Sequence, residues 1–326
     1  MNVLVTGATG FIGRHLIGQL THENACVRVL ALPDEDTSAL DRLGVEIVRG
    51  DVLDCESLQR AASNCRQIYH LAARTEVSGP SRQDLTKINV QGTENVARAA
   101  LSAGIDRLIF SSSVGLYGRA IRNRAISEET IPTPDSPYGQ SKLSAERILL
   151  SHHQRDGLSV VLARISAVLG PGAMSWLSLF KAIAAGRFRF IGEGRNYYHP
   201  TDIADIVEGL ILCGSVSGIE GQTFLLAGPE PVYLRDFVQI IAEAVRAPEL
   251  PTGLPEWPFR PYATSSRHLF SWTGHRLPRA DRLDLYLGDR AFDLSRSRRL
   301  LGYVPKVGTK EAVHHTTAWF KEHGYF

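Results

Sequence analysis

The chain has 326 residues, of which 44% are hydrophobic and 21% charged, and its formal net charge is +2. This length fits one large or two modest domains, with an apolar content ordinary for a globular protein. The net charge is too small to argue for nucleic-acid binding, so we expect no nucleic-acid partner, and no apolar run approaches the ~20 residues that span a bilayer.

Cysteines occur at positions 26, 55, 65 and 213, and neither a CxxC nor an HExxH motif is present. We therefore expect no metal site and reduced, structural thiols. Because a glycine-rich turn starts at residue 7, we expect no signal peptide and a cytoplasmic protein.

The first element is a short apolar, β-branched segment, residues 2–6, typical of a strand covered on both faces. Gly7, Gly10 and Gly13 follow in the spacing G-x-x-G-x-x-G and lead into an amphipathic stretch over 12–22. Glycines let the chain turn sharply, and a helix N-terminus offers free N–H groups to a pyrophosphate. We predict a dinucleotide site here; the alternative is a glycine turn that binds nothing.

Apolar segments then alternate with helical patterns along the chain. The further predicted strands are 26–31, 45–49, 67–71, 107–112 and 159–164. The further predicted helices are 35–43, 55–63, 83–104 and 138–155. This alternation predicts an α/β fold with a Rossmann-type doubly wound parallel sheet, whose ligands bind outside the carboxyl ends of the strands.

After Gly170-Pro171-Gly172 the composition changes, and residues 229–290 become rich in proline, arginine and aromatic residues. Two helical patterns, 175–186 and 201–214, and one strand pattern, 222–227, lie in between. We predict an NAD(P)-binding domain over 1–170, to which 201–228 returns. Residues 171–200 and 229–326 would then form a smaller, irregular substrate lobe.

Tyr138 and Lys142 are four residues apart, so they share one face of the predicted helix. A free tyrosine has a pKa of ~10, and a nearby ammonium lowers that value towards the neutral range. Ser111, Ser112 and Ser113 follow an apolar strand, where a hydroxyl can bind a substrate oxygen. The alternatives are a surface pair on the helix and a serine-rich cap at the strand end.

Together these motifs resemble the extended short-chain dehydrogenases/reductases, often called the epimerase/dehydratase family. The resemblance covers nearly the whole chain and is specific in its N-terminal two-thirds. Its motifs are Thr6-Gly-Ala-Thr-Gly-Phe-Ile-Gly13, Gly50-Asp51-Val52, His70-Leu-Ala-Ala73, Asn89-Val-Gln-Gly-Thr93, Pro137-Tyr138-x-x-x-Lys142, His199-Pro-Thr-Asp202 and Leu301-Gly-Tyr-x-Pro305. Ser113 lies 138 − 113 = 25 residues before Tyr138, as similar epimerases space their catalytic pair.

The resemblance implies NAD(P)-dependent hydride transfer at a secondary alcohol or ketone carbon. Tyr138 is then the general acid/base, Lys142 tunes it, and Ser113 aligns the substrate oxygen. The cofactor is expected to be NAD, with NADP left open, because Asp34 at the end of the second predicted strand could reach the ribose. The implied cofactor residues are Gly7, Gly10, Phe11, Ile12, Gly13, Asp34, Asp51, Val52, Leu71, Ala72, Ala73, Asn89, Ser111, Tyr138, Lys142 and Ile165.

The family pattern also bears on the substrate. Val114-Gly115 replace the Asp-Glu of the dehydratases, so we expect an epimerase or reductase acting on a nucleotide-activated sugar. Ala167 and the lack of an Arg-Asp pair after Gly192-Glu-Gly194 depart from that class. The expected substrate residues are Ser113, Arg195, Tyr198, His199 and Arg260.

Two other functions remain open. The C-terminal signatures also resemble the 3β-hydroxysteroid dehydrogenase branch, which would oxidise a sterol-like alcohol in a lobe lined by Trp176, Phe180, Trp257 and Phe270. A redox-inactive NAD(P)-binding sensor is the alternative of another class. The family resemblance further implies a homodimer through the helices 83–104 and 138–155.

Overall fold

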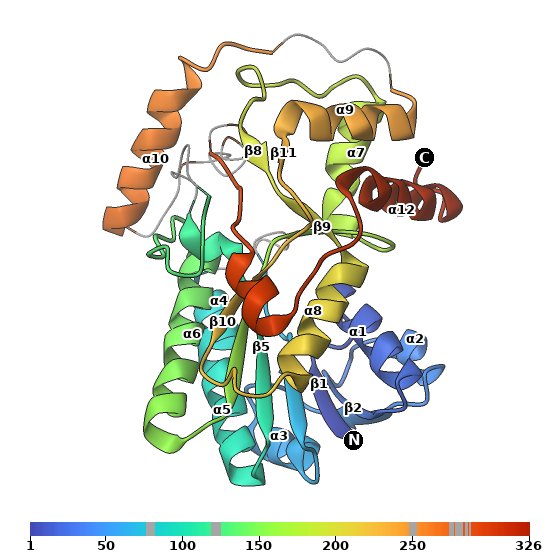
Figure 1. The fold of residues 1–326 in the computed structure, drawn as a ribbon, viewed down its shortest axis with the longest axis vertical. Helices are drawn as coiled ribbons and strands as arrows, with labels where there is room; N and C mark the ends of the chain where they lie inside the picture. The colour runs from blue at the N-terminus through green and yellow to red at the C-terminus, as the bar shows by residue number, and fades with distance from the viewer. Residues whose placement is uncertain are drawn as a thin grey trace.

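The computed structural model describes residues 1–75, 82–118, 125–247, 253–273, 277, 283, 286 and 288–326. Its centre is a seven-stranded sheet in the order β3-β2-β1-β4-β5-β6-β10, with every neighbouring pair parallel (Figure 1). The strands are β1 (Asn2–Thr6), β2 (Cys26–Ala31), β3 (Glu46–Arg49), β4 (Gln67–His70), β5 (Arg107–Ser113), β6 (Val160–Ile165) and β10 (Thr223–Leu226).

From β1 the chain adds strands β2 and β3 on one side, and from β4 it adds β5, β6 and β10 on the other. The direction of strand order therefore reverses between β1 and β4, which pair with each other. In an open parallel sheet this reversal opens a crevice at the carboxyl ends of the two strands, where ligands bind. The predicted Rossmann-type doubly wound fold is therefore confirmed, and the strand bounds agree with the sequence pattern to within a residue.

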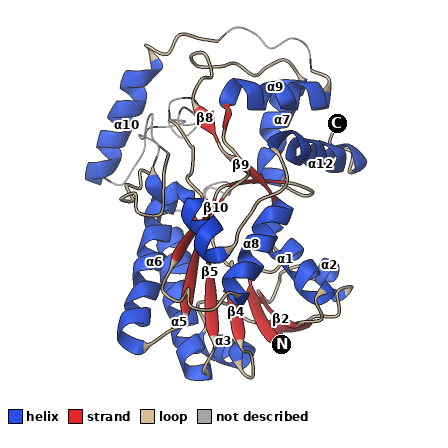
Figure 2. Cartoon of the chain, viewed as in Figure 1, coloured by secondary structure: helices blue, strands red, loops and turns tan. Residues whose placement is uncertain are grey.

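Helices cover both faces of the sheet (Figure 2). The α-helices that the structure describes, in the sheet layers and in the lobe together, are α1 (Phe11–His22), α2 (Ser38–Asp41), α3 (Cys55–Ala62), α4 (Arg82–Leu85), α5 (Gly92–Ala103), α6 (Pro137–Asp156), α7 (Leu177–Ala184), α8 (Ile203–Ser215), α9 (Leu234–Val245), α10 (Phe259–Thr273) and α12 (Thr309–Glu322). Side chains alternate across a strand, so Val3 and Val5 join one apolar core with α1 and α8. Leu4 joins the opposite core with α3, α5 and α6.

Two helix predictions were wrong in extent. The helix expected over 35–43 is confined to α2, because Asp36 accepts a hydrogen bond from the Ser38 N–H and Arg49 donates to the Glu35 carbonyl. The helix expected over 83–104 is interrupted by a π-helical segment, η2 (Thr86–Gln91), between α4 and α5. Such wide turns are frequent at functional sites because they redirect side chains.

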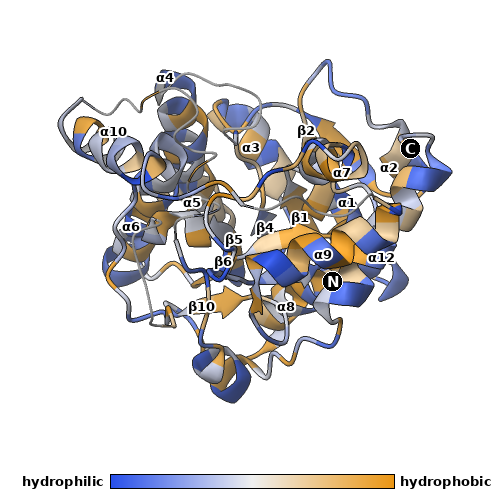
Figure 3. Ribbon diagram, turned by 90° about the horizontal axis from the view of Figure 1, so that it is seen from above, coloured by the Kyte–Doolittle hydropathy of each residue, from blue (hydrophilic) through white to orange (hydrophobic). Residues whose placement is uncertain are grey.

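The remaining elements form a lobe above the carboxyl edge of the sheet (Figure 1). The small strands β7 (Ala167–Leu169) and β9 (Pro200–Asp202) pair in parallel, while β8 (Tyr197–Tyr198) and β11 (Val232–Tyr233) pair antiparallel. A separate apolar core joins α7, α9 and α12. Figure 3 shows apolar residues of these elements in orange. No helix in the described part of the chain is long and apolar enough to cross a bilayer.

Candidate active site

The glycine turn closes against the end of β4. Gly7 has a φ of +71°, and a Cβ there would lie 2.6 Å from the Ala72 nitrogen, so this position accepts only glycine. At Gly13 a Cβ would collide with the Gly7 carbonyl, which shows how tightly α1 packs on the turn. Gly10 is the N-cap of α1 and provides no side-chain cap. The result is a backbone cradle at a helix N-terminus, which fits the pyrophosphate of a dinucleotide.

The predicted catalytic side chains come from β5 and the first turns of α6. Ser136 caps α6 by accepting the Gly139 N–H at 3.1 Å, and Pro137 starts the helix. A Cβ on Gly115 would lie 3.3 Å from Ser113 Oγ and 3.8 Å from the Tyr138 ring. Ser113 Oγ and the Tyr138 ring therefore both lie within 4 Å of the same point beside Gly115.

Lys142 lies one turn beyond Tyr138 and is 3% exposed. Its Nζ donates to the Ser111 carbonyl at 2.7 Å and lies 4.6 Å from the centre of the Phe110 ring. Burial lowers the pKa of Lys142 to about 8, an effect opposed by the negative charge of Glu146. The ammonium is thus held at the end of β5, with a protonation state sensitive to its neighbours.

A buried hydrogen-bond chain links the glycine turn to the centre of the sheet. The Ala72 N–H donates to Thr6 Oγ1 (3.3 Å), and the Thr6 hydroxyl donates to His70 Nδ1 at 2.7 Å, because the single proton of the neutral ring is on Nε2. His70 Nε2 then donates to Thr93 Oγ1 (3.0 Å), and Thr93 donates to the Asn89 carbonyl (2.7 Å). Burial lowers the pKa of His70 to about 3, so the ring is neutral.

Asn89 extends this hydrogen-bond chain to α6, which carries Tyr138 and Lys142. Its side chain accepts the Arg74 N–H (2.8 Å) and donates to the Arg74 carbonyl (3.0 Å) and to Ser141 Oγ (2.9 Å). Ser141 in turn donates to the Tyr138 carbonyl at 2.8 Å. The π-helical turn η2 thus directs Asn89 between the end of β4 and α6, where it holds the backbone of both.

Where the adenosine of NAD is expected to bind, after β2, the structure favours a different carboxylate from the predicted Asp34. Asp34 is exposed, whereas Glu35 is half-buried and accepts hydrogen bonds from the Leu32 N–H (3.1 Å) and the Thr9 hydroxyl. Thr9 belongs to the glycine turn, so Glu35 is the carboxylate that the structure brings to the cradle. The role of Glu35 was not evident from the sequence, because the predicted helix 35–43 placed this residue inside a helix rather than in the turn after β2.

The other predicted cofactor residues lie along the same edge of the sheet. Asp51 follows β3 and accepts the Leu53 N–H at 3.0 Å, and the carbonyl of the buried Val52 accepts from Asn95 at 3.0 Å. The half-buried residues of this edge are Phe11, Ile12, Leu71, Ala72 and Ala73. The buried ones are Ser111, at the end of β5, and Ile165, which ends β6.

The predicted substrate residues do not converge in the same way. Arg195 is exposed and pairs with Glu193 at 2.8 Å, while Arg260 is exposed and its Nε donates to Glu256 at 2.7 Å. His199 is 2% exposed. Its Nε2 donates to the Gly228 carbonyl (2.9 Å) and its Nδ1 accepts the Phe292 N–H (3.1 Å). Tyr198 packs against Trp176 and Phe237.

The four aromatic residues expected to line an apolar site also occupy different environments. Phe180 has no exposed surface and Phe270 is 3% exposed, so both are core residues. Trp176 is half-buried, with its indole N–H donated to the Val168 carbonyl at 2.8 Å. Only Trp257, which is 77% exposed, presents its ring to a ligand. The expectation of one shared aromatic lining was wrong.

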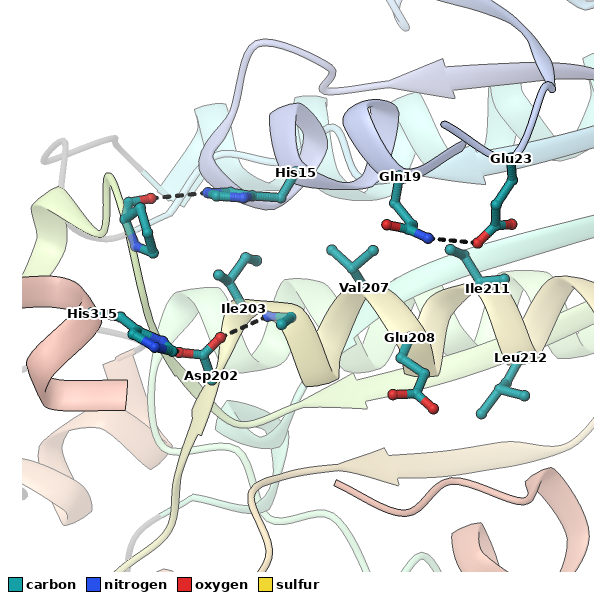
Figure 4. Close-up of a pocket in the computed structure, with 12 residues that line it drawn as sticks. His15, Gln19, Glu23, Asp202, Ile203, Val207, Glu208, Ile211, Leu212 and His315 are labelled. Atoms are coloured by element: carbon teal, nitrogen blue, oxygen red, sulfur yellow. Dashed lines mark hydrogen bonds and ion pairs between the residues drawn. The ribbon is translucent and has the colours of Figure 1, made fainter. Parts of the chain in front are cut away.

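A groove of about 730 Å³ lies apart from the predicted catalytic residues, between α1 and α8 (Figure 4). Its walls carry His15, Gln19 and Glu23 on one side and Ile203, Val207 and Ile211 on the other. At one end Asp202 caps α8 and pairs with His315 at 3.0 Å. Across the described ranges, no cluster of three or more His, Cys, Asp or Glu side chains could hold a metal ion.

Comparison with known proteins decides the family. The model of the NAD dependent epimerase/dehydratase family matches residues 3–226, which include the glycine turn, Ser113 and the Tyr138–Lys142 helix. The chain belongs to this family. As a member of the epimerase/dehydratase family it is an oxidoreductase of the extended short-chain type, and NAD is the cofactor of that family.

Two curated relatives span nearly all of the chain. Sterol demethylase protein B of Methylococcus capsulatus is 30% identical over 336 residues, covering 99% of each chain. The 4-hydroxy-2-methyl-3-oxo-4-farnesyl-3,4-dihydroquinoline-1-oxide ketoreductase of Stigmatella aurantiaca is 29% identical, covering 96% of this chain and 95% of its own. Among solved structures, MoeE5 in complex with UDP-glucuronic acid and NAD superposes with a TM-score of 0.77 at 26% identity, covering 99% and 100% of the two chains.

Proposed function

We propose that this family member is an NAD-dependent dehydrogenase or ketoreductase that acts on a secondary alcohol or ketone of a large apolar substrate. The observation that carries the proposal is the convergence of Ser113 and Tyr138 at Gly115, with the Lys142 ammonium one helical turn away. A buried ammonium beside a phenol stabilises the phenolate. Helix α6 therefore carries both the proposed base, Tyr138, and the cation that stabilises its phenolate, Lys142.

In the oxidation direction the Tyr138 phenolate accepts the proton of the substrate alcohol. The hydride leaves the same carbon for the nicotinamide ring, which is the chemistry that NAD supplies when bound. Ser113 donates a hydrogen bond to the substrate oxygen and stabilises the charge that develops on it. Reduction of a ketone runs through the same groups in reverse, with Tyr138 as the acid.

The proposal of an apolar substrate departs from the nucleotide sugar that the sequence favoured. Arg195 and Arg260 pair with neighbouring carboxylates instead of being left for a diphosphate. The lobe around α10 exposes Leu254 (44%), Trp257 (77%) and Trp272 (89%). These large apolar side chains lie at the two ends of α10 and offer apolar surface to a ligand. The names of the two curated relatives, one sterol and one farnesyl compound, point the same way.

A nucleotide-activated sugar is the second candidate, as an epimerase or reductase substrate. It is supported by the likeness to MoeE5 bound to UDP-glucuronic acid and NAD. Val114 is buried beside Ser113 and Gly115 follows it, where dehydratases have Asp-Glu, which supports a reaction without water elimination.

Panels of substrates separate the two candidates. The purified protein is given NAD with hydroxysteroids and secondary isoprenoid alcohols, and separately with UDP-, GDP-, dTDP- and CDP-sugars. We expect cofactor reduction, followed by absorbance, with the apolar panel. Thermal stabilisation by a nucleotide sugar without any by the apolar panel would reverse the choice. NAD binding with turnover of neither panel would favour the redox-inactive sensor.

We further propose that residues 1–170 with 201–228 form the cofactor domain, and 171–200 with 229–326 the substrate lobe. The pairing of β10 with β6 supports the return of 201–228 to the sheet. We also propose a homodimer through the helices 83–104 and 138–155; α5 and α6 pack side by side on one face of the sheet, which supports a shared four-helix contact. Light scattering at micromolar concentration tests it, since a monomer would contradict it.

A further inference from the structure

A buried carboxylate lies one helical turn beyond Lys142. Glu146 is 1% exposed, and both of its oxygens are occupied. Ser112 Oγ donates to Oε1 at 2.5 Å. Arg164 donates from Nε to Oε1 at 3.0 Å and from Nη2 to Oε2 at 2.7 Å. The bidentate ion pair connects α6 to β6, and the Ser112 hydrogen bond connects α6 to β5, one helical turn beyond Lys142.

Stability alone does not explain such a pair. The desolvation of two buried charges often offsets their attraction, and apolar residues of similar volume serve as well or better. The position of the pair is more informative. Ser112, which donates to Glu146, stands between Ser111, whose carbonyl holds Lys142, and the predicted catalytic Ser113. Glu146 therefore contacts the segment that places both groups.

The charges around Lys142 single out Glu146. Tyr138 shares α6 with Lys142, His70 on β4 is neutral, and Arg164 on β6 is the partner of Glu146. The other charged groups described on elements packed against α6 are Asp84 and Lys87, both exposed, the Glu94–Arg98 pair on α5, and Arg107 at the start of β5, which pairs with Glu220. Among the described residues around Lys142, Glu146 is thus the buried anion. Its charge raises the pKa of Lys142 against the lowering by burial.

We propose that Glu146 is a positioning residue for the acid/base site. Held by Ser112 and Arg164, its carboxylate keeps Lys142 protonated at the end of β5, so that the Tyr138 phenol retains a cationic neighbour. The proposal rests on the proposed function, because it assigns Tyr138 the role of acid/base. It adds a group that touches neither substrate nor cofactor and acts through Lys142.

The test follows the titration of Tyr138 and needs no substrate. Ultraviolet absorbance reports tyrosinate, and the difference between each protein and its Tyr138→Phe counterpart isolates the one phenol. We expect Glu146→Gln to raise the titration midpoint of Tyr138 by about one pH unit, a tenfold loss of phenolate below the midpoint. Glu146→Asp, which keeps the negative charge, should have a Tyr138 midpoint close to that of the parent protein.

A double-variant cycle shows whether the effect passes through Lys142. In a Lys142→Met background, Glu146→Gln should no longer raise the midpoint. Ser112→Ala is the matched control, since it removes a hydrogen bond to the same carboxylate but leaves the charge; it should change the midpoint by less than about 0.3 pH unit. All titrations are repeated with saturating NAD, which keeps unstable variants folded.

The outcomes distinguish a failure of the Glu146 proposal from a failure of the proposed function. An unchanged midpoint in Glu146→Gln, or an equal rise in the Lys142→Met background, overturns the role of Glu146 and leaves the proposed function standing. A Tyr138 midpoint no lower in the parent protein than in Lys142→Met would overturn the proposed acid/base pair itself. A rise in Glu146→Gln that vanishes in the Lys142→Met background supports the proposal.

Discussion

The sheet edge and the lobe above it hold their polar residues in opposite ways. At the edge, Lys142, His70 and Asn89 are buried, and hydrogen bonds fix each of them. In the lobe, Arg195 and Arg260 lie at the surface in ion pairs with carboxylates close in sequence. These three residues beside the proposed reaction site are therefore buried and fixed in the core, whereas the arginines predicted to bind substrate lie on exposed surfaces.

The largest expected effect is at Tyr138. Tyr138→Phe removes the proton acceptor and should lower kcat by about 10²- to 10⁴-fold, the usual contribution of a general acid or base. NAD affinity, measured by calorimetry, should stay within about twofold, because the ring is retained. Tyr233→Phe, at a half-exposed tyrosine of the lobe, is the control. A near-parental rate for Tyr138→Phe would contradict the assignment of Tyr138.

Alanine substitutions at Gly7 and Gly44 test how rigid the glycine turn at the carboxyl edge of the sheet is. Gly7→Ala places a methyl group 2.6 Å from the Ala72 nitrogen at a φ of +71°, whereas Gly44, at +66°, has open space around it. Gly44→Ala should cost about 1 kcal/mol of unfolding free energy, the strain of positive φ alone. Gly7→Ala should cost at least about 2 kcal/mol more and abolish NAD binding. Equal costs in urea unfolding would show that the turn yields to the methyl group.

Glu35 tests which carboxylate serves the cofactor. We propose that Glu35, which contacts Thr9 of the turn, is close enough to bind the adenosine ribose. Loss of a charged hydrogen bond of this kind costs about 1.5–3 kcal/mol, so Glu35→Gln should weaken NAD binding at least tenfold. Asp34→Asn, at the exposed neighbour, should leave it unchanged. The opposite ranking in calorimetry would restore Asp34 as the ribose ligand.

The contrast between the regions also shows what sequence can reveal. The glycine turn was predictable because its backbone geometry demands glycine, as at Gly7 and Gly13. The seven strands were predictable from their short apolar segments. Asn89 was among the residues that the family resemblance implied, but the π-helical turn that carries it was not predicted, since a local sequence pattern does not distinguish a π-helix from an α-helix. Glu146 was missed because a helix position gives no sign of the Arg164 that faces it.

Acid should destabilise the folded protein through its buried histidines, His70 at the sheet edge and His199 in the lobe, because burial lowers the pKa of both. The pKa of His70 is lowered to about 3 by burial, so the unfolded chain binds a proton near pH 6.5 that the folded protein does not. The contribution of His70 to the free energy of unfolding is therefore full above about pH 6.5 and is lost as the pH drops from there towards 3. His70→Gln cannot be protonated, so its urea midpoint should fall less between pH 7.5 and 5. Equal slopes would show that another group governs acid sensitivity.

The smallest effects are expected in the lobe. Arg195→Ala and Arg260→Ala each remove an exposed ion pair, which contributes about 0–1 kcal/mol to stability. If the substrate is apolar, neither change should alter its KM by more than about twofold, since no charged group of the substrate would lose a partner. A tenfold rise in KM for a nucleotide sugar in either variant would mean that the arginine leaves its carboxylate for a diphosphate when substrate binds. The lobe would then resemble the edge after all, with its recognition groups ordered by the ligand rather than by the fold.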